Sequence, residues 1–452
     1  MIYKKIFNVN TLKQTAFNDW SHIVLLGSIL LYAFTRFIDP VASQIAQGVL
    51  VFYMAYFFVK NPDQIRRDPM YLLFIGVIIS QIATWGSVEM FHPEIQDNTL
   101  KIDKLGKLFL FIPIAWGLQR KPKWVPIVLL TACVGFTADL LFGCDFFAQV
   151  ALAIQGQRVD FGVRNAQHTS MVFGLMVIIS IFYMAVADKK TKMGIAFLFF
   201  TMGLAGLTVT QTRQTFFGII VAVGFVFILS CFLTKLNLKK IMISVVMMAV
   251  LFGTASYSIT INHRQNEAWD TIKTFTDPMP ENLQTAGKKE ILAYYISKQK
   301  DSGSGLRVKL WLGMLPYVYQ NPFLGWGSNS IEGLIKNNPY FINEKSVTNM
   351  GHLHNFHITL YICCGIIGVL LINGIYVWLL LSSFRDRKQI PHGDQWFLLS
   401  VGFVTYWQVI NCFENFSGFW TGVFCHNLIL GCIYAHYFSN KKVLNVYSLM
   451  KW

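Results

Sequence analysis

Residues 354–384, HNFHITLYICCGIIGVLLINGIYVWLLLSSF, join a polar segment to a long apolar run. The apolar part exceeds the roughly 20 residues that a helix needs to cross a bilayer. The imidazole of His354 therefore lies at a predicted membrane boundary, where it can exchange a proton near neutral pH. Nine residues separate Asn355 from Gly365, which places this glycine about three helical turns from the histidine. One interpretation is an interfacial histidine above a helix contact of the small-xxx-small type in this apolar run.

The rest of the chain has the composition of a polytopic membrane protein. Of 452 residues, 54% are hydrophobic and 13% are charged, and the mean hydropathy is +0.46. We predict an all-α fold with about twelve membrane spans. No cleavable signal peptide is expected, because the first apolar run starts late and lacks a small-residue cleavage site. The predicted spans are residues 20–35, 43–59, 71–88, 108–118, 125–141, 169–187, 194–209, 215–233, 241–259, 356–384, 396–410 and 421–438.

The net charge of +15 is a topology signal rather than a sign of nucleic-acid binding. With the N-terminus inside, the cytoplasmic segments would hold 21 of the 38 basic residues but only six of the 23 acidic ones. Each of these segments then carries about three positive charges, as the positive-inside rule requires. We therefore predict that both termini are cytoplasmic and that the longest loop lies outside.

The predicted spans divide the chain into three parts. Residues 1–259 form an N-terminal membrane region of about nine spans, and residues 355–452 form a C-terminal membrane region of about three. Between them, residues 260–354 form a long, partly helical loop on the outer side, before the last three spans. A loop of this length that contains helices is usually functional.

Two stretches of this loop are predicted to be helical. KKEILAYYISKQ (residues 288–299) has an amphipathic pattern, and its apolar stripe would lie on the membrane or cover the domain. GLRVKLWLGMLPYVYQNPFLGWG (residues 305–327) has a helical apolar period that Pro316 or Pro322 ends, followed by a glycine-rich turn.

Four arginines on the predicted outer side are candidates for binding an anion: Arg158, Arg164, Arg213 and Arg307. Arg213 lies between two apolar spans with no acidic residue nearby in the sequence, so its guanidinium needs an anionic partner or water. A lipid-linked phosphate or diphosphate meets this need through bidentate hydrogen bonds. The alternatives are arginines that snorkel to lipid headgroups or, for Arg307, an interfacial anchor.

Arginines and a histidine on the same side of a membrane indicate a transfer reaction. Arginines can neutralise a diphosphate leaving group, and a histidine can remove the proton of a hydroxyl acceptor. His352 and His357 are rivals to His354 for this role. The sequence has no paired-aspartate motif on an outer loop and no Cys/His ligand spacing, so we predict no metal. Glycosyl transfer from a lipid diphosphate agrees with these features.

Three stretches resemble the bacterial O-antigen ligase family. HNFHITLYICCGIIG (residues 354–368) matches its pattern of histidine, then Asn, Ser or Gln, nine residues and Gly-x-x-Gly, and only His354 fits that spacing. TRQTFFG (residues 212–218) resembles the family's arginine after a preceding helix. LRVKLWLGMLPYVYQNPFLGWG (residues 306–327) resembles the stretch before the histidine, with its arginine, a tryptophan four residues on and a Pro-x-x-Gly-x-Gly turn. Those residues are Arg307, Trp311, Pro322, Gly325 and Gly327.

The resemblance implies a reaction at the periplasmic face of the bacterial inner membrane. Polysaccharide would pass from undecaprenyl diphosphate to a sugar hydroxyl of the lipid A core, among membrane lipids and without a metal or cofactor. Arg213 and Arg307 would bind the donor diphosphate, and His354 would be the general base or orient the acceptor. The residues expected to support them are Arg158, Arg164, Trp311, His352 and Asn355.

Other functions agree with parts of this pattern. An O-antigen polymerase uses the same donor but extends another lipid-linked chain, and a protein O-oligosaccharyltransferase belongs to the same wider superfamily. About twelve spans with both ends inside also describe many secondary transporters. The chain shows no symmetry between its halves and no acidic or histidine relay within its spans, which disfavours a transporter.

Overall fold

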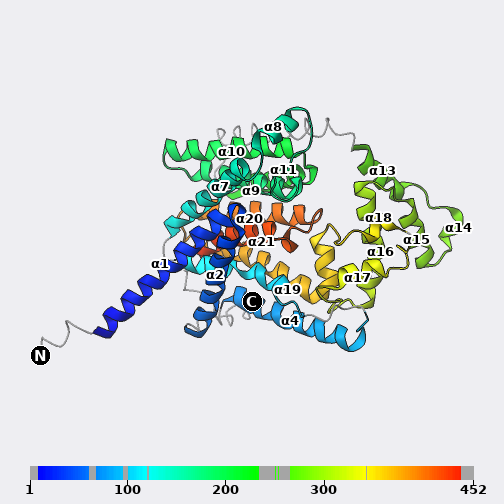
Figure 1. Cartoon of the computed structure of the whole chain (residues 1–452), viewed down its shortest axis with the longest axis horizontal. Helices are drawn as coiled ribbons and strands as arrows, with labels where there is room; N and C mark the ends of the chain where they lie inside the picture. The colour runs from blue at the N-terminus through cyan, green and yellow to red at the C-terminus, as the bar shows by residue number, and fades with distance from the viewer. Residues whose placement is uncertain are drawn as a thin grey trace, which may run out of the picture.

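A computed structural model describes residues 9–60, 68–94, 100–119, 122–233, 250, 253, 265–342 and 344–438. Over these residues the chain is helical and contains no strand, which confirms the predicted all-α class (Figure 1). The long helices are α1 (Val9–Ile38), α2 (Pro40–Lys60), α4 (Pro69–Phe91), α7 (Val125–Phe142), α9 (Ala166–Val186), α10 (Lys190–Thr210), α11 (Arg213–Leu233), α16 (Gly303–Gln320), α19 (Phe356–Asp386), α20 (Gly393–Asn411) and α21 (Trp420–Phe438). The shorter ones are α5 (Asp103–Gly106), η1 (Lys107–Phe109), α6 (Phe111–Gln119), η2 (Pro122–Trp124), α8 (Phe146–Ile154), α13 (Gln265–Thr276), α14 (Glu281–Gln284), α15 (Lys288–Lys298), α17 (Ser330–Lys336), α18 (Lys345–Thr348) and η3 (Phe416–Gly418).

Eight helices in the described part of the chain are long and apolar enough to cross a membrane. They are α1, α2, α4, α7 with the preceding η2, α9, α10, α11 and α19. Each corresponds to a predicted span. The predicted span at 108–118 folds instead as η1 and α6, and the nine residues of α6 extend about 13 Å, too short to cross a bilayer.

The remaining predicted spans do not join this set of eight. Residues 396–410 and 421–438 fall within α20 and α21, which are helical but are not among the eight that are long and apolar enough to cross a membrane. The predicted span at 241–259 lies outside the described residues, apart from two isolated positions. The expected total of about twelve therefore stays a prediction.

The helices of the long loop, α13 to α18, gather at one end of the molecule, beside the end of α19 that carries His354 (Figure 1). The helices α20 and α21 run through the centre, with α9, α10 and α11 on one side and α4 and α19 on the other (Figure 1). Helix α11 packs on α20, helix α21 packs on α6, and helix α19 packs on α4. Most residues of α20 and α21 are buried, as expected for helices enclosed by others.

Short polar side chains define the starts of the helices that lead to the site. The Ser302 hydroxyl accepts a hydrogen bond from the Gly305 N–H at 3.1 Å and caps α16, which carries Arg307. The helix continues through Pro316 and ends before Pro322, so Pro322 is the residue that stops it. The amphipathic helix predicted from residues 288–299 is present as α15, and it packs on α16.

Helix α19 is broken at Gly365, where φ is +60° and ψ is −167°. The loop before α17 inserts into this break: the Trp326 N–H donates to the Ile362 carbonyl at 2.8 Å, and the Ile366 N–H donates to the Pro322 carbonyl at 2.8 Å. A Cβ at Gly365 would overlap the Phe323 backbone, so glycine is required. Gly365 thus contacts a loop, in contrast to the helix–helix contact considered from the sequence.

Candidate functional site

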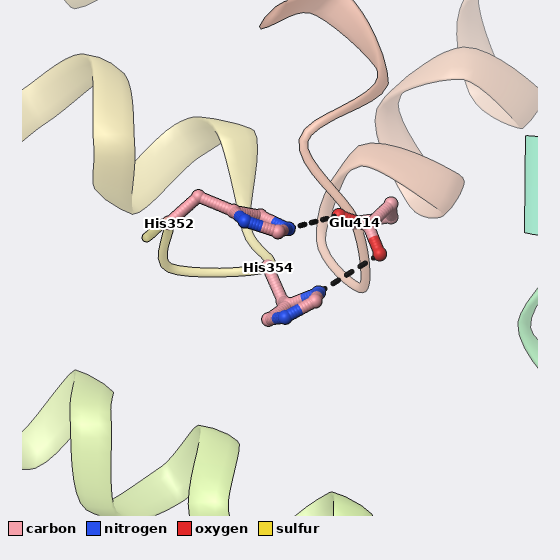
Figure 2. Close-up of side chains that lie close together, drawn as sticks. All are labelled: His352, His354 and Glu414. Atoms are coloured by element: carbon pink, nitrogen blue, oxygen red, sulfur yellow. Dashed lines mark hydrogen bonds and ion pairs between the residues drawn. The ribbon is translucent and has the colours of Figure 1, made fainter. Parts of the chain in front are cut away.

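Glu414 bridges two histidines that lie just before the start of α19, and Figure 2 shows both imidazole rings pointing toward its carboxylate. Nδ1 of His354 lies 2.9 Å from Oε2 of Glu414. Nε2 of His352 lies 3.3 Å from Oε1. The Glu414 side chain is 2% exposed, whereas the two histidines are 20% and 33% exposed. The carboxylate is therefore buried behind two imidazoles that remain accessible.

The surroundings of Glu414 keep it ionised. Burial raises the pKa of the carboxyl, but hydrogen bonds from His352, His354 and the Asn415 N–H outweigh burial and hold this pKa well below its usual range. Because an ionised carboxylate can only accept, His354 must donate from Nδ1–H. In the neutral ring, Nε2 of His354 is then the basic nitrogen. This is the arrangement expected of a general base with an orienting carboxylate.

The backbone at His354 is held in an uncommon conformation. Its φ is +48°, a left-handed value that costs on the order of 1–3 kcal/mol for a residue other than glycine. On one side, the Trp311 indole N–H donates to the Leu353 carbonyl at 2.7 Å. On the other, Asn355 accepts from the Ile358 N–H at 3.0 Å and donates to the Cys412 carbonyl at 2.9 Å. Both groups of the Asn355 amide are thus used to fix the backbone beside the histidine.

Arg307 lies near the carboxylate of Glu414, and Arg213, from a distant helix, lies near Arg307. Nη2 of Arg307 lies 4.0 Å from Oε2 of Glu414, the oxygen that His354 contacts. Burial lowers the pKa of Arg307, the Glu414 carboxylate raises it, and the nearby charge of Arg213 lowers it again. Arg213 is the first residue of α11, so the two cations reach one region from α16 and α11. Adjacent cations are stabilised when an anion binds between them.

The other two predicted arginines contact the surroundings of the site. Arg158 donates from Nε to the Thr210 carbonyl at 3.2 Å and from Nη2 to the Thr212 hydroxyl at 3.3 Å. These bonds brace the turn that leads into Arg213. The Cζ atom of Arg164 lies 3.8 Å from the ring centre of Phe419. The same ring lies 5.3 Å from that of His352, which places Arg164 on the His352 side.

His357 does not join the other two histidines. Its Nε2 lies 3.1 Å from the Gln408 carbonyl, so this nitrogen donates. Its side chain lines an apolar groove on the other side of α19, together with residues of α16. His357 is therefore placed as a groove residue, and His352 and His354 as the pair that flanks the carboxylate.

The three residues of Figure 2 also have the composition of a metal site. One potential ligand atom each from His352, His354 and Glu414 lies within 4.8 Å of the others, and no second such group occurs among the residues that the structure describes. Three protein ligands of this kind are the usual set of a catalytic Zn²⁺. The arrangement can therefore either hold a divalent cation or act as a base with its carboxylate.

Glu414 did not emerge from the sequence. It lies 60 residues after His354, in the short segment between α20 and η3. The available signal was an acidic residue in a break between two apolar runs, where a charge near a membrane boundary usually serves a function.

Comparison with known families now adds to this geometry. Residues 197–372 match the model of a family described as O-antigen ligase. These residues thus form a segment of the O-antigen ligase family. No curated protein matches the chain. The O-antigen ligase segment contains Arg213, Arg307 and His354 and ends before Glu414, so the match includes three members of the site and leaves out the carboxylate.

The match supports a glycosyltransferase-like enzyme of the O-antigen ligase and polymerase superfamily, and it does not separate ligases from polymerases. Together with the eight apolar helices, it indicates a multi-pass membrane protein.

Proposed function

We propose that the chain is an O-antigen ligase, which transfers polysaccharide from undecaprenyl diphosphate to the lipid A core at the periplasmic face of the inner membrane. One observation carries this assignment: Arg307 and His354 both lie against the same oxygen of Glu414, and Arg213 is close enough to lower the pKa of Arg307. A base and two guanidinium groups are what an alcohol acceptor and a diphosphate leaving group require.

In this reaction Nε2 of His354 takes the proton from the acceptor hydroxyl. The acceptor oxygen then forms a bond to the anomeric carbon of the donor sugar, and the bond from that carbon to the diphosphate oxygen breaks. The diphosphate leaves with the electron pair, and Arg213 and Arg307 neutralise its charge. The carboxylate of Glu414 stabilises the imidazolium that forms on His354.

An apolar groove beside Arg307 is suited to the polyprenyl chain of the donor. It has a volume of about 540 Å³ and lies between α13, α16 and α19. The residue next to Arg307, Val308, lines it, and so do Trp311, Leu315 and Tyr361. A diphosphate on Arg307 would place the first isoprene units at this groove, where burial of their apolar surface contributes to binding.

The polymerase remains the second candidate, because the family match applies to both enzymes. It would use the same donor and the same base. The difference lies in the acceptor, which is a second lipid-linked glycan for a polymerase and the lipid A core for a ligase.

The direct test uses the purified full chain in liposomes with lipid-linked polysaccharide as donor. Lipid A–core and a lipid-linked single repeat are offered as acceptors in separate reactions, and products are resolved on gels. We expect product only on lipid A–core, and none with His354→Ala. Extension of the lipid-linked repeat with no product on lipid A–core would assign the polymerase instead.

A further inference from the structure

A cationic cavity lies beside His352 and is not used by the groups assigned above. It has a volume of about 480 Å³ and is bounded by α5 with η1, the start of α17, the outer part of α19 and the segment around η3. Three lysines close in sequence line it: Lys101, Lys104 and Lys107. Polar residues of the remaining wall include Ser328, Asn329 and Asn415.

The positive charges of this cavity exceed its negative ones. Glu332 is the acidic residue in its wall, and that carboxylate pairs with Lys336 at 2.7 Å. Burial lowers the pKa of Lys107, Asp103 raises it, and the charges of Lys104 and Arg36 lower it again. The net direction is downward, chiefly because of burial, and repulsion from Lys104 and Arg36 adds to it. An anion bound in the cavity would relieve this repulsion.

The lysines are held at the wall by the surrounding fold. The Lys104 ammonium donates to the Ser328 carbonyl at 2.5 Å, which ties it to the loop that precedes α17. The carbonyl of Lys107 accepts a hydrogen bond from the buried Asn427 side chain at 2.8 Å, which fixes the backbone of η1. The Lys104 ammonium and the backbone of Lys107 are therefore positioned before a ligand arrives, and this lowers the entropic cost of binding.

The two oxygens of Glu414 separate this cavity from the arginines. Oε1 is bonded to the Asn415 N–H and faces His352, and both of these residues line the cavity. Oε2 faces His354 and Arg307. The imidazole rings of His352 and His354 are only 3.9 Å apart. A molecule in the cavity would thus lie near His352 and Oε1, whereas a diphosphate on Arg307 would lie near Oε2.

We infer that this cavity is the acceptor subsite and that it binds a phosphate group on the sugar that receives the chain. The inference rests on the proposed function, since it presumes that His354 activates an acceptor hydroxyl. Lysine ammonium groups bind such anions as point charges, without the fork geometry that suits arginine to a diphosphate. His352 borders the cavity and shares Glu414 with the base, so it would position the acceptor.

The test compares acceptor use by the wild type and by the double variant Lys104→Gln/Lys107→Gln. Each is assayed in liposomes with native, phosphorylated lipid A–core and with the same acceptor after phosphatase treatment. We expect the double variant to raise the KM for the phosphorylated acceptor by about tenfold or more, as for loss of charged hydrogen bonds. The KM for the donor and for the dephosphorylated acceptor should stay within twofold of wild type.

Two further variants provide controls. Lys298→Gln/Lys345→Gln removes two exposed lysines of the long loop that do not line the cavity, and it should leave both KM values unchanged. Lys104→Arg/Lys107→Arg keeps the charges and should retain a low KM for the phosphorylated acceptor. If the glutamine variant does not fold, the wild type still decides the question through its preference between the two acceptors.

Several outcomes would overturn the assignment. Equal KM values for the two acceptors in the wild type would show that the lysines do not bind the acceptor phosphate. An unchanged KM for the phosphorylated acceptor in the glutamine variant would show the same. Competition by anionic phospholipids that disappears in the glutamine variant, without an effect on acceptor KM, would assign the cavity to a membrane headgroup instead. If the wild type transferred polysaccharide to no acceptor at all, the proposed function itself would be wrong, and this outcome is distinct from those above.

Discussion

His354 and Glu414 lie 60 residues apart in the chain, yet Nδ1 of one is 2.9 Å from Oε2 of the other. The carboxylate fixes the tautomer of the imidazole and leaves Nε2 as the basic nitrogen. It also contacts His352 through its second oxygen, so one buried group orients two rings. The site is thereby organised around a residue outside the segment that the family model matches.

Glu414→Gln should reduce turnover by about 10²–10⁴-fold, since an amide can neither fix both imidazoles nor stabilise the imidazolium. The KM for the donor should change little, because the arginines remain. The measurement is initial-rate kinetics in liposomes, with the exposed Glu281→Gln as matched control. Turnover within threefold of wild type in Glu414→Gln would show that the carboxylate does not assist the base.

His354→Ala and His357→Ala should behave differently. Removal of a general base lowers the rate by about 10²–10⁴-fold, so His354→Ala should lose ligation while its amount in the membrane stays normal. His357 lies in the apolar groove and donates to the Gln408 carbonyl, so its replacement should affect the donor KM more than the turnover. Lipopolysaccharide ladders from cells that carry each variant report the loss of ligation, and initial rates in liposomes at varied donor concentration separate KM from turnover. Normal long-chain lipopolysaccharide in cells with His354→Ala would show that His354 is not the general base.

Arg213→Lys and Arg307→Lys should each raise the KM for the donor by roughly tenfold, because a lysine keeps the charge but loses the paired N–H groups. Arg213→Ala and Arg307→Ala should raise the KM for the donor further than the lysine variants do. Arg385→Lys changes an arginine at the far end of α19, which pairs with Asp386, and serves as control. Should the lysine and alanine variants both match wild type, the two arginines would be membrane anchors.

Removal of divalent cations should not change the activity. The expectation rests on the proposed function, in which Arg213 and Arg307 neutralise the diphosphate without a metal. The assay is donor transfer before and after EDTA treatment, with added Mg²⁺ or Zn²⁺ as the reverse step. Loss with EDTA that Zn²⁺ restores would identify His352, His354 and Glu414 as ligands.

The site residues that local sequence pattern indicates could be predicted from the sequence. Arg213, Arg307 and His354 stand at the edges of apolar segments, where a charge contrasts with its surroundings. The contact between Glu414 and His354 depends on how the segment after α20 packs against the start of α19, and no local pattern describes that packing. The lysine cavity was missed for the same reason, because its walls come from four separate parts of the chain.

The break in α19 shows a second limit of pattern analysis. The apolar run continues through Gly365 without interruption, since the residues on both sides still face an apolar environment. The hydrogen bonds lost at the break are replaced by the loop at residues 321–327, which lies about forty residues earlier in the chain. Periodicity reports burial, so it cannot distinguish a helix that bonds to itself from one that bonds to an inserted loop.

Gly365→Ala should destabilise the protein and reduce its activity together. The glycine has φ +60° and ψ −167°, a region that costs other residues on the order of 1–3 kcal/mol, and an added Cβ would also overlap the Phe323 backbone. Displacement of this loop would shift α16, which carries Arg307 and Trp311, relative to His354. Thermal unfolding of purified protein and turnover of the folded fraction measure the two effects. Gly194→Ala in α10 meets no neighbouring atom within 4 Å and should change neither. A Gly365→Ala protein with wild-type unfolding temperature and turnover would show that the inserted loop does not support the site.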